Sequence, residues 1–306
     1  MDCTTRDLKL VGMGSKEMGL KGIRMLAKSL AKSTTTQTLY MEGCVIGGVA
    51  GARVLAKALI ANTSIQSVSL RRENVGSKGT IELAKVLGQN TSIQSLDLCC
   101  NCIKSDGVYA LAETLARNTT LHTLDLSYNL IESDGISALA KALMTNTTLK
   151  TLNLANILID YDGISALAKV LTQNTSLQNL YLYSNDIDLE SARALADALT
   201  INTSLQTLDL GDNLMGLECV DVFAKALAQN DTLQSIILTH NDVGLDGSNA
   251  FIGVNADRKR RSTNVNIMLF LGYIDASSCL SLLPGDLEIL KTIMHMTVLP
   301  PLNCTC

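Results

Sequence analysis

Hydrophobic and polar positions alternate in short stretches of the chain, and each stretch is followed by a segment with a different spacing. In residues 123–127, leucines alternate with polar side chains, which is the period of two expected of a short strand with one buried face. Between Ile136 and Leu143 the apolar residues form one stripe on a helix. Ser133 or Asp134 precedes this stripe and is a suitable helix start. The pattern predicts a strand, a turn and a helix.

This unit recurs along most of the chain. The stretch NTSLQTLDLGDN, residues 202–213, has near-copies whose leading asparagines are spaced 28 residues apart. The leading asparagines are Asn62, Asn90, Asn118, Asn146, Asn174, Asn202 and Asn230. An earlier copy begins at Ser33, and half a unit precedes it. A period of this size predicts a solenoid, in which each unit buries its apolar face against its neighbours.

The repeat divides the chain into three parts. Residues 1–32 form an N-terminal capping half repeat, residues 33–253 hold eight repeats of 28 or 29 residues, and residues 254–306 hold a degenerate last repeat with a capping helix and tail. We expect a final strand at residues 267–271. Because every unit repeats the same elements, the strands stack in parallel and the helices lie on the other side. Helices are wider than strands, so the predicted α/β solenoid curves, with strands on its concave face and helices on its convex face.

The residues that carry this pattern resemble a known family. The LxxLxLxxNxL core and the length of the units over about residues 8–253 are similar to leucine-rich repeats of the ribonuclease-inhibitor type. The sequence NTSLQTLDLGDN within the repeat is also similar to the leucine-rich repeat region of NOD-like receptors. No GxxxxGK[ST] phosphate-binding loop occurs in the sequence. The resemblance implies a horseshoe that binds another macromolecule and is not an enzyme.

The resemblance also implies a ladder of asparagines, whose side chains satisfy backbone groups where the chain leaves each strand. The ladder positions are Asn101, Asn129, Asn185, Asn213 and Asn241. In three other repeats the register places Cys44, Glu73 and Ile157 at this position. Either these repeats turn differently, or the adjacent Asn74 and Asn156 substitute.

The leading asparagines allow a second interpretation, because NTS, NTT and NDT are also acceptor sequences for glycosylation, as is NCT at Asn303. The same asparagine recurs with the structural period, directly after each predicted helix, where asparagine can end a helix. No secretory signal is recognisable at the N-terminus. We therefore favour the structural interpretation.

Composition narrows the class of protein. Hydrophobic residues make up 47% of the chain but aromatic residues only 3%, so the core must be aliphatic. A net charge of -4 and a pI near 5.4 provide no broad positive field, which argues against a nucleic-acid partner. No apolar run is long enough to span a membrane. We expect a monomer in the cytoplasm, or in a host cytoplasm if the source is an intracellular microbe.

The cysteines also bear on compartment and chemistry. Nine cysteines form an odd set without regular spacing, which favours a reduced compartment. Cys99, Cys100 and Cys102 lie close in sequence, but a tetrahedral zinc site needs a fourth ligand, which the sequence does not offer. We favour structural or tolerated thiols and expect neither a metal nor a cofactor.

Candidate binding residues are the outward positions of the strands and the turns that follow them. Aromatic side chains anchor protein interfaces, and charged ones select a partner. The predicted concave-face patch consists of Arg71, Asp97, Asp125, Tyr128, Tyr181, Tyr183 and Asp209. The plain alternative is an ordinary solvated face. The three histidines are scattered over different units, so no catalytic group is predicted.

Two other functions stay open at this stage. Ran-specific GTPase activators are built from similar repeats, and Arg71 and Arg72 are the residues to test for such an activity. The segment LLPGDLEILKTIM, residues 282–294, faintly resembles the opening of F-box segments, which would make the chain a substrate adaptor of a ubiquitin ligase. Its plainer role is to cover the apolar end of the last repeat.

Overall fold

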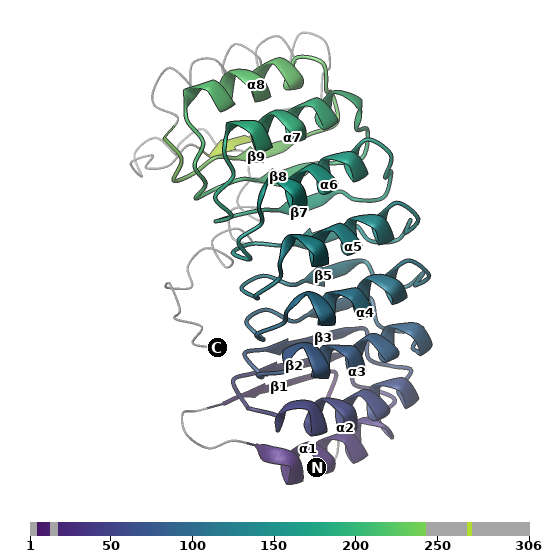
Figure 1. Ribbon diagram of the computed structural model, residues 1–306. Coiled ribbons are helices and arrows are strands. Elements are labelled where there is room, and N and C mark those ends of the chain that lie inside the picture. Colours follow the sequence, from purple (N-terminus) through teal and green to yellow (C-terminus); the bar gives the residue numbers. More distant parts are fainter. Residues whose placement is uncertain (1–4, 13–17, 243–267, 271–306) are drawn as a thin grey trace, which may run out of the picture.

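Strands and helices form two layers in the computed structural model, which describes residues 5–12, 18–242 and 268–270 (Figure 1). In these residues ten strands form one sheet, with neighbours in the sheet following chain order. The strands are β1 (Asp7–Val11), β2 (Thr38–Glu42), β3 (Ser67–Arg71), β4 (Ser95–Asp97), β5 (Thr123–Asp125), β6 (Thr151–Asn153), β7 (Asn179–Tyr181), β8 (Thr207–Asp209), β9 (Ser235–Ile237) and β10 (Met268–Phe270).

Eight helices connect the first nine strands in the described part of the chain. They are α1 (Gly19–Leu30), α2 (Gly48–Ala61), α3 (Gly76–Gln89), α4 (Ser105–Leu115), α5 (Ser133–Leu143), α6 (Tyr161–Leu171), α7 (Leu189–Ile201) and α8 (Leu217–Leu227). All of them lie on one side of the sheet (Figure 1). The predicted α/β solenoid is therefore confirmed, and β10 lies where the final strand was expected, next to β9.

The register of the sheet follows the repeat. Leu96 on β4 is opposite Leu124 on β5, and Leu124 is opposite Leu152 on β6, so equivalent residues stack. These leucines are buried, with at most 3% of their surface exposed. Each strand turns such residues toward the helices, where the leucines, isoleucines and alanines of the helical stripes form one continuous core. Burial of each large aliphatic side chain contributes about 1.5–3 kcal/mol.

The helix starts differ from the prediction by one or two residues. The N-cap residue of α5 is Glu132, which makes no side-chain capping bond, and Ser133 is already inside the helix. Asp134 accepts a hydrogen bond from the Ser105 hydroxyl one repeat earlier. Side-chain caps occur at Asp160 on α6 and at Asp188 on α7, the positions equivalent to Glu132. A carboxylate there reaches the free N–H groups of the first turn, whereas Asp134 is placed to link two repeats.

The leading asparagines join successive repeats. Asn146 Nδ2 donates to the carbonyl oxygens of Leu115 and Asn118, and its Oδ1 accepts from the N–H groups of Thr148 and Leu149. All seven asparagines are buried, with 2–8% exposed. The backbone at Asn62, Asn90 and Asn202 is extended, so these asparagines end their helices through side-chain bonds and not through a left-handed backbone.

This geometry supports the structural interpretation over glycosylation. A sugar would be attached to Nδ2, the atom that donates to backbone carbonyl groups of the previous repeat. A glycan at that atom would remove these bonds and would have no space in the core. Asn303 lies outside the described residues.

Candidate binding surface

The ladder asparagines tie the end of one strand to the next repeat. Asn101 Oδ1 accepts from the N–H groups of Glu73 and Val75 at 3.1 Å, and Asn101 Nδ2 donates to the Leu70 carbonyl at 2.6 Å. The same pattern of contacts recurs at Asn129, Asn185, Asn213 and Asn241. These side chains bond backbone groups that the short strands leave without a partner in the sheet.

Glu73 takes the ladder position in one repeat, and the two proposed substitutes do not. Glu73 is fully buried, and its Oε1 accepts from the Cys44 N–H at 2.9 Å. Burial raises the pKa of the Glu73 carboxyl. Asn156 instead donates to the Ser184 hydroxyl, and Asn74 is exposed. Arg72 and Asn156, which precede Glu73 and Ile157, both have the left-handed backbone found in the other repeats, so the turn is not different.

The residue before each ladder position has a positive φ. The series is Arg72, Cys100, Tyr128, Asn156, Ser184, Asp212 and His240, with φ between 51° and 57°. This backbone costs most side chains about 1 kcal/mol or more, and only glycine and asparagine adopt it readily. The chain therefore needs this turn wherever it leaves a strand, whatever the side chain. This left-handed backbone also sets the direction of the side chain of Tyr128, a predicted binding residue.

The three aspartates of the predicted patch make structural contacts. Asp97, Asp125 and Asp209 each accept, through Oδ1, the N–H of the residue two positions later, at 2.8–3.0 Å. Asn153 makes the same bond at the equivalent position. The strand ends at these residues, so the following N–H needs a side-chain acceptor. This local contact could have been expected from the sequence, because aspartate and asparagine commonly bond the backbone two residues on.

Two of these aspartates are also buried. Asp125 is 9% exposed and Asp209 is 5% exposed, because the side chains of adjacent strands crowd them. Burial raises the pKa of Asp125 to about 6, with a further contribution from the Asp97 carboxylate, and it raises the pKa of Asp209 to about 6. The alternation of apolar and polar residues along the strands predicted that these carboxylates lie on an accessible face. In the structure only a small part of their surface is accessible to a partner.

Arg71 and Arg72 each have an acidic partner in the N-terminal half of the concave face. The guanidinium of Arg71 contacts Asp97 Oδ2 at 3.3 Å and donates to Cys99 Sγ at 3.2 Å. Arg72 contacts Glu42 Oε1 at 3.3 Å. Arg71 and Asp97, both predicted binding residues, are therefore brought together, and neither charge is free to act alone.

Tyr181 and Tyr183 form the aromatic part of the surface. Tyr181 lies on β7 between Asn153 and Asp209 of the neighbouring strands. The ring of Tyr183 lies over Gly211, where an added Cβ atom would be 3.0 Å from Tyr183 Cδ2. Both side chains are partly exposed. Burial raises the pKa of Tyr181, and burial together with the Asp212 carboxylate raises the pKa of Tyr183 to about 12. Both phenols are neutral at physiological pH.

The cysteines give a mixed result. Cys44, Cys99 and Cys219 carry free thiols. Cys102 is disulfide-bonded, which the preference for a reduced compartment did not lead us to expect. Within the described residues, no group of three or more His, Cys, Asp or Glu side chains is placed to hold a metal ion. No helix in that part of the chain is long and apolar enough to cross a membrane.

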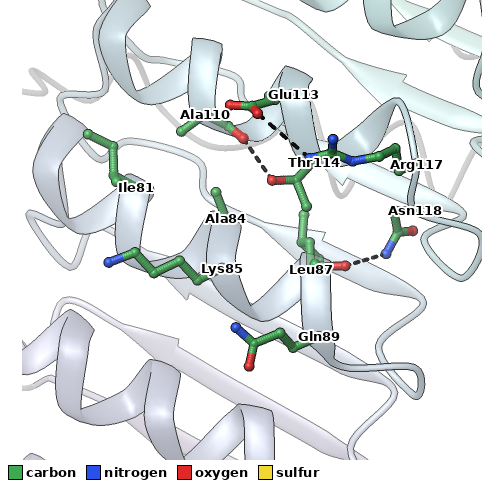
Figure 2. Close-up of a pocket in the computed structure, with 11 residues that line it drawn as sticks. Ile81, Ala84, Lys85, Leu87, Gln89, Ala110, Glu113, Thr114, Arg117 and Asn118 are labelled. Carbon is green, nitrogen blue, oxygen red and sulfur yellow. Dashed lines mark hydrogen bonds and ion pairs between the residues drawn. The ribbon is translucent and has the colours of Figure 1, made fainter.

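The convex side has hollows between successive helices. One of them, of about 380 Å³, lies between α3 and α4 and is lined by Lys85, Glu113 and Arg117 among others (Figure 2). Glu113 and Arg117 form an ion pair of 3.7 Å and are 77% and 76% exposed. A larger hollow of about 1040 Å³ lies between α4 and α5 and includes Met144. Neither is lined by histidine or cysteine, so these hollows offer no nucleophile or metal ligand of those types.

Comparison with known proteins agrees with the repeat. Residues 89–112, 117–140 and 173–196 match the family model described as Leucine Rich repeat. Among solved structures, the chain is similar to leiomodin-1 actin-binding site 2, with 23% identity and a TM-score of 0.44 over 50% of this chain and 88% of that one. It is also similar to the tropomodulin C-terminal domain of Caenorhabditis elegans, with 15% identity and a TM-score of 0.44 over 51% and 94%. No curated protein sequence matches the chain.

Proposed function

We propose that this leucine-rich repeat protein is a non-enzymatic scaffold whose concave face binds a protein partner through Tyr181 and Tyr183. The observation that carries the proposal is the position of the Tyr183 ring, which lies over Gly211 and is partly exposed. A large, rigid aromatic side chain with small neighbours is a favourable anchor for an interface. Leu180 and Leu182, which alternate with these tyrosines, are fully buried in the core and take no part in binding.

The other predicted binding residues have different roles in this proposal. Asp125 and Asp209 hold the strand ends and position the surface, whereas Tyr128 stands in the turn beside it. Arg71 with Asp97 lies farther along the sheet as a paired, nearly neutral unit. We infer that tyrosines supply most of the binding energy and that the charged residues supply orientation.

The GTPase activator is less well supported by this geometry. An arginine that stabilises charge on a nucleotide must be free to reach it, and both Arg71 and Arg72 are engaged in ion pairs. The F-box-like segment at residues 282–294 lies outside the described residues, so the adaptor function stays a prediction. The likeness to the ribonuclease-inhibitor type and to NOD-like receptors, the cytoplasmic location, the monomeric state and the three-part division of the chain are part of the same proposal.

Affinity capture from native cytosol tests the scaffold. The immobilised chain is compared with a Tyr181→Ala, Tyr183→Ala double variant and with Tyr161→Ala, a control at an exposed tyrosine on α6. We expect the double variant to lose a partner that the wild type and the control retain, with about 2 kcal/mol weaker binding if both residues are hot spots. Retention by a well-folded double variant would refute the tyrosine site. GTP hydrolysis that depends on Arg71 would instead favour the activator.

A further inference from the structure

An apolar groove lies at one edge of the solenoid, where the chain passes from a strand to the next helix. This edge groove has a volume of about 520 Å³ and lies between the turn after β5 and the turn after β6. Ile131 and Ile157 are buried beneath it, whereas Leu130 and Leu158, which also line it, are 44% and 70% exposed. Leu130 and Leu158 occupy the same position in successive repeats, and Leu214 at the equivalent position is 67% exposed.

The stability of the repeat does not account for these exposed leucines. Leu158 has a φ of 56°, a backbone conformation that is unfavourable for leucine. The N–H of Leu130 donates to the Ile103 carbonyl at 2.8 Å, a bond that any residue except proline can make. Other repeats have the polar residues Asn74 and Asp186 at this position. The leucines therefore add apolar surface where the fold does not need it, and exposed apolar surface with a polar border is typical of interaction sites.

Carboxylates border the edge groove. Glu132, Asp134 and Asp160 line it together with the leucines. Helices α5 and α6 begin here, and negative charge is favourable at the N-terminal end of a helix, so these acids also have a local structural role. However, the sequence has no lysine, arginine or histidine in residues 126–136 or 154–164, which form the two turns. No side chain of these turns balances the negative charge.

Two of these carboxyl groups are ionised at neutral pH. Hydrogen bonds with the Ser133 side chain and with the Gly163 N–H lower the pKa of Asp160. A hydrogen bond from the Ser105 hydroxyl lowers the pKa of Asp134. A partner that covers the groove must therefore supply positive charge as well as apolar surface.

We propose that the edge groove binds a segment of a partner protein in which lysine or arginine side chains border apolar ones. The apolar side chains lie against Leu130 and Leu158, and the cations meet the carboxylates of Glu132 and Asp160. A segment with only one of these features leaves either the leucines or the carboxylates without a counterpart. The groove is a second surface, and its use does not depend on the concave-face site at Tyr181.

The probe is a fluorescently labelled peptide of roughly 15 residues, with leucines on one side of a helix and lysines on the other. Binding to the full chain is measured by fluorescence anisotropy. One control peptide has glutamate in place of lysine, and another has serine in place of leucine. We expect the lysine–leucine peptide to bind at least about tenfold more tightly than either control. Its affinity should fall as salt is added, because the contacts with the carboxylates are exposed.

The apolar contact is tested by changing Leu130→Asn together with Leu158→Asn. This double variant should weaken peptide binding about tenfold or more, because two leucines lose their apolar contact. The matched control is Met25→Asn with Ile201→Asn, two residues that are 65% and 61% exposed on α1 and α7. The control should bind the peptide as the wild type does.

The charge contact is tested by Glu132→Gln with Asp160→Asn. Asparagine keeps the cap of α6, since its side-chain oxygen can still accept the bond from Gly163. The change should weaken binding several-fold and make it less sensitive to salt. Glu113→Gln with Asp197→Asn removes the same charge from exposed helix positions elsewhere and should leave the salt dependence unchanged.

Four results would overturn the proposal. One is full peptide binding by the Leu130→Asn, Leu158→Asn variant when it melts like the wild type. A second is equal binding of the glutamate peptide. A third is self-association of the free chain that this same variant abolishes, which would assign the groove to a second copy of the chain. The fourth is loss of peptide binding in Tyr181→Ala, Tyr183→Ala, which would place the peptide on the concave face, whereas capture of the native partner tests that face separately.

Discussion

Asn146 donates through Nδ2 to the carbonyl oxygen of Leu115, at a distance of 2.8 Å. Leu115 ends α4, and Asn146 follows α5, so the bond joins the helix ends of two successive repeats. With the bonds from Thr148 and Leu149 to Asn146 Oδ1, one side chain serves both a helix end and a strand entry. This second ladder runs along the opposite ends of the helices from the Asn101 ladder.

Replacing Asn146 with alanine should therefore be costly. The change leaves buried backbone groups without partners, at about 1–3 kcal/mol for each group. We expect a loss of several kcal/mol in the free energy of unfolding, measured by chemical denaturation. Asn179→Ala is the control, because Asn179 is less buried and its side chain donates to the Thr151 hydroxyl, at 3.1 Å, and not to a backbone group. A loss no larger than the control's would show that water replaces the side chain.

The architecture could be predicted from the sequence because the same pattern of apolar and polar residues, which predicts a strand, a turn and a helix, recurs in every repeat. The alternation around Leu124 located β5, and the spacing of the leading asparagines located the ends of the helices from α2 to α8. Leu126 lies just beyond β5, yet its N–H still bonds the Asn153 carbonyl, so the alternation continues past the formal strand end. A single repeat read alone would have given a much weaker prediction.

The candidate surface was harder to predict, because it depends on contacts between repeats. Asp125 is outward by alternation but buried by its neighbours on adjacent strands, and Asn153 donates to its second carboxyl oxygen. The space for the Tyr183 ring depends on Gly211, one repeat later. Glu73 shows the same limit, since nothing local indicates that a glutamate can take the place of a ladder asparagine.

Asp209→Asn should stabilise the protein at neutral pH. Burial raises the pKa of Asp209 from 3.8 to about 6. Below pH 3.8 the carboxyl is protonated in both the folded and unfolded states. As the pH rises toward 6, the unfolded state releases its proton first, so stability is lost in this window, by at most about 3 kcal/mol. Asparagine removes this loss and can keep the bond to Gly211, as Asn153 does for Ala155.

The measurement is the free energy of unfolding at several pH values for wild type, Asp209→Asn and Asp197→Asn, an exposed carboxylate on α7. The difference between wild type and Asp209→Asn should grow between pH 4 and 6 and then stay constant. A difference that does not depend on pH would mean that Asp209 is solvated in solution.

Leu158→Asn should raise stability although it removes an apolar side chain. Leu158 is 70% exposed and has a φ of 56°, so it gains little from burial and occupies a backbone conformation that is unfavourable for leucine. Asparagine adopts this conformation readily, and we expect a gain of about 0.5–1 kcal/mol. Leu214→Asn is the control, since Leu214 is 67% exposed but is not among the residues with positive φ. Equal melting shifts for the two variants would contradict the argument from backbone strain.

Glu73→Gln tests the substituted ladder position. The amide keeps an acceptor for the Cys44 N–H and removes a carboxyl whose pKa is raised by burial. Glu73 Oε2 has no hydrogen-bond partner among the described residues. Because the raised pKa makes the carboxylate costly above pH 4.5, we expect the variant to be more stable at pH 7 by on the order of 1 kcal/mol, and to lose this advantage in acid. Lower stability at every pH would indicate that burial of the glutamine NH2 group without an acceptor costs more than burial of the carboxyl.

Gly211→Val should displace the Tyr183 ring without changing the tyrosine itself. A Cβ atom at residue 211 would lie 3.0 Å from Tyr183 Cδ2 and 2.7 Å from Thr239 Oγ1, so both side chains must move toward solvent. Tyr183 would then lose the burial that raises its pKa to about 12, and its pKa should fall toward 10.0.

Ultraviolet titration of wild type, Gly211→Val and Tyr183→Phe isolates this one phenol. If Tyr183 anchors the partner, Gly211→Val should also weaken the captured complex about as much as Tyr183→Ala does. Gly88→Val on α3, where an added Cβ meets only Thr114 at 3.4 Å, should leave both the titration and the complex unchanged. Full binding by a Gly211→Val variant with a lowered tyrosine pKa would place the partner elsewhere on the solenoid.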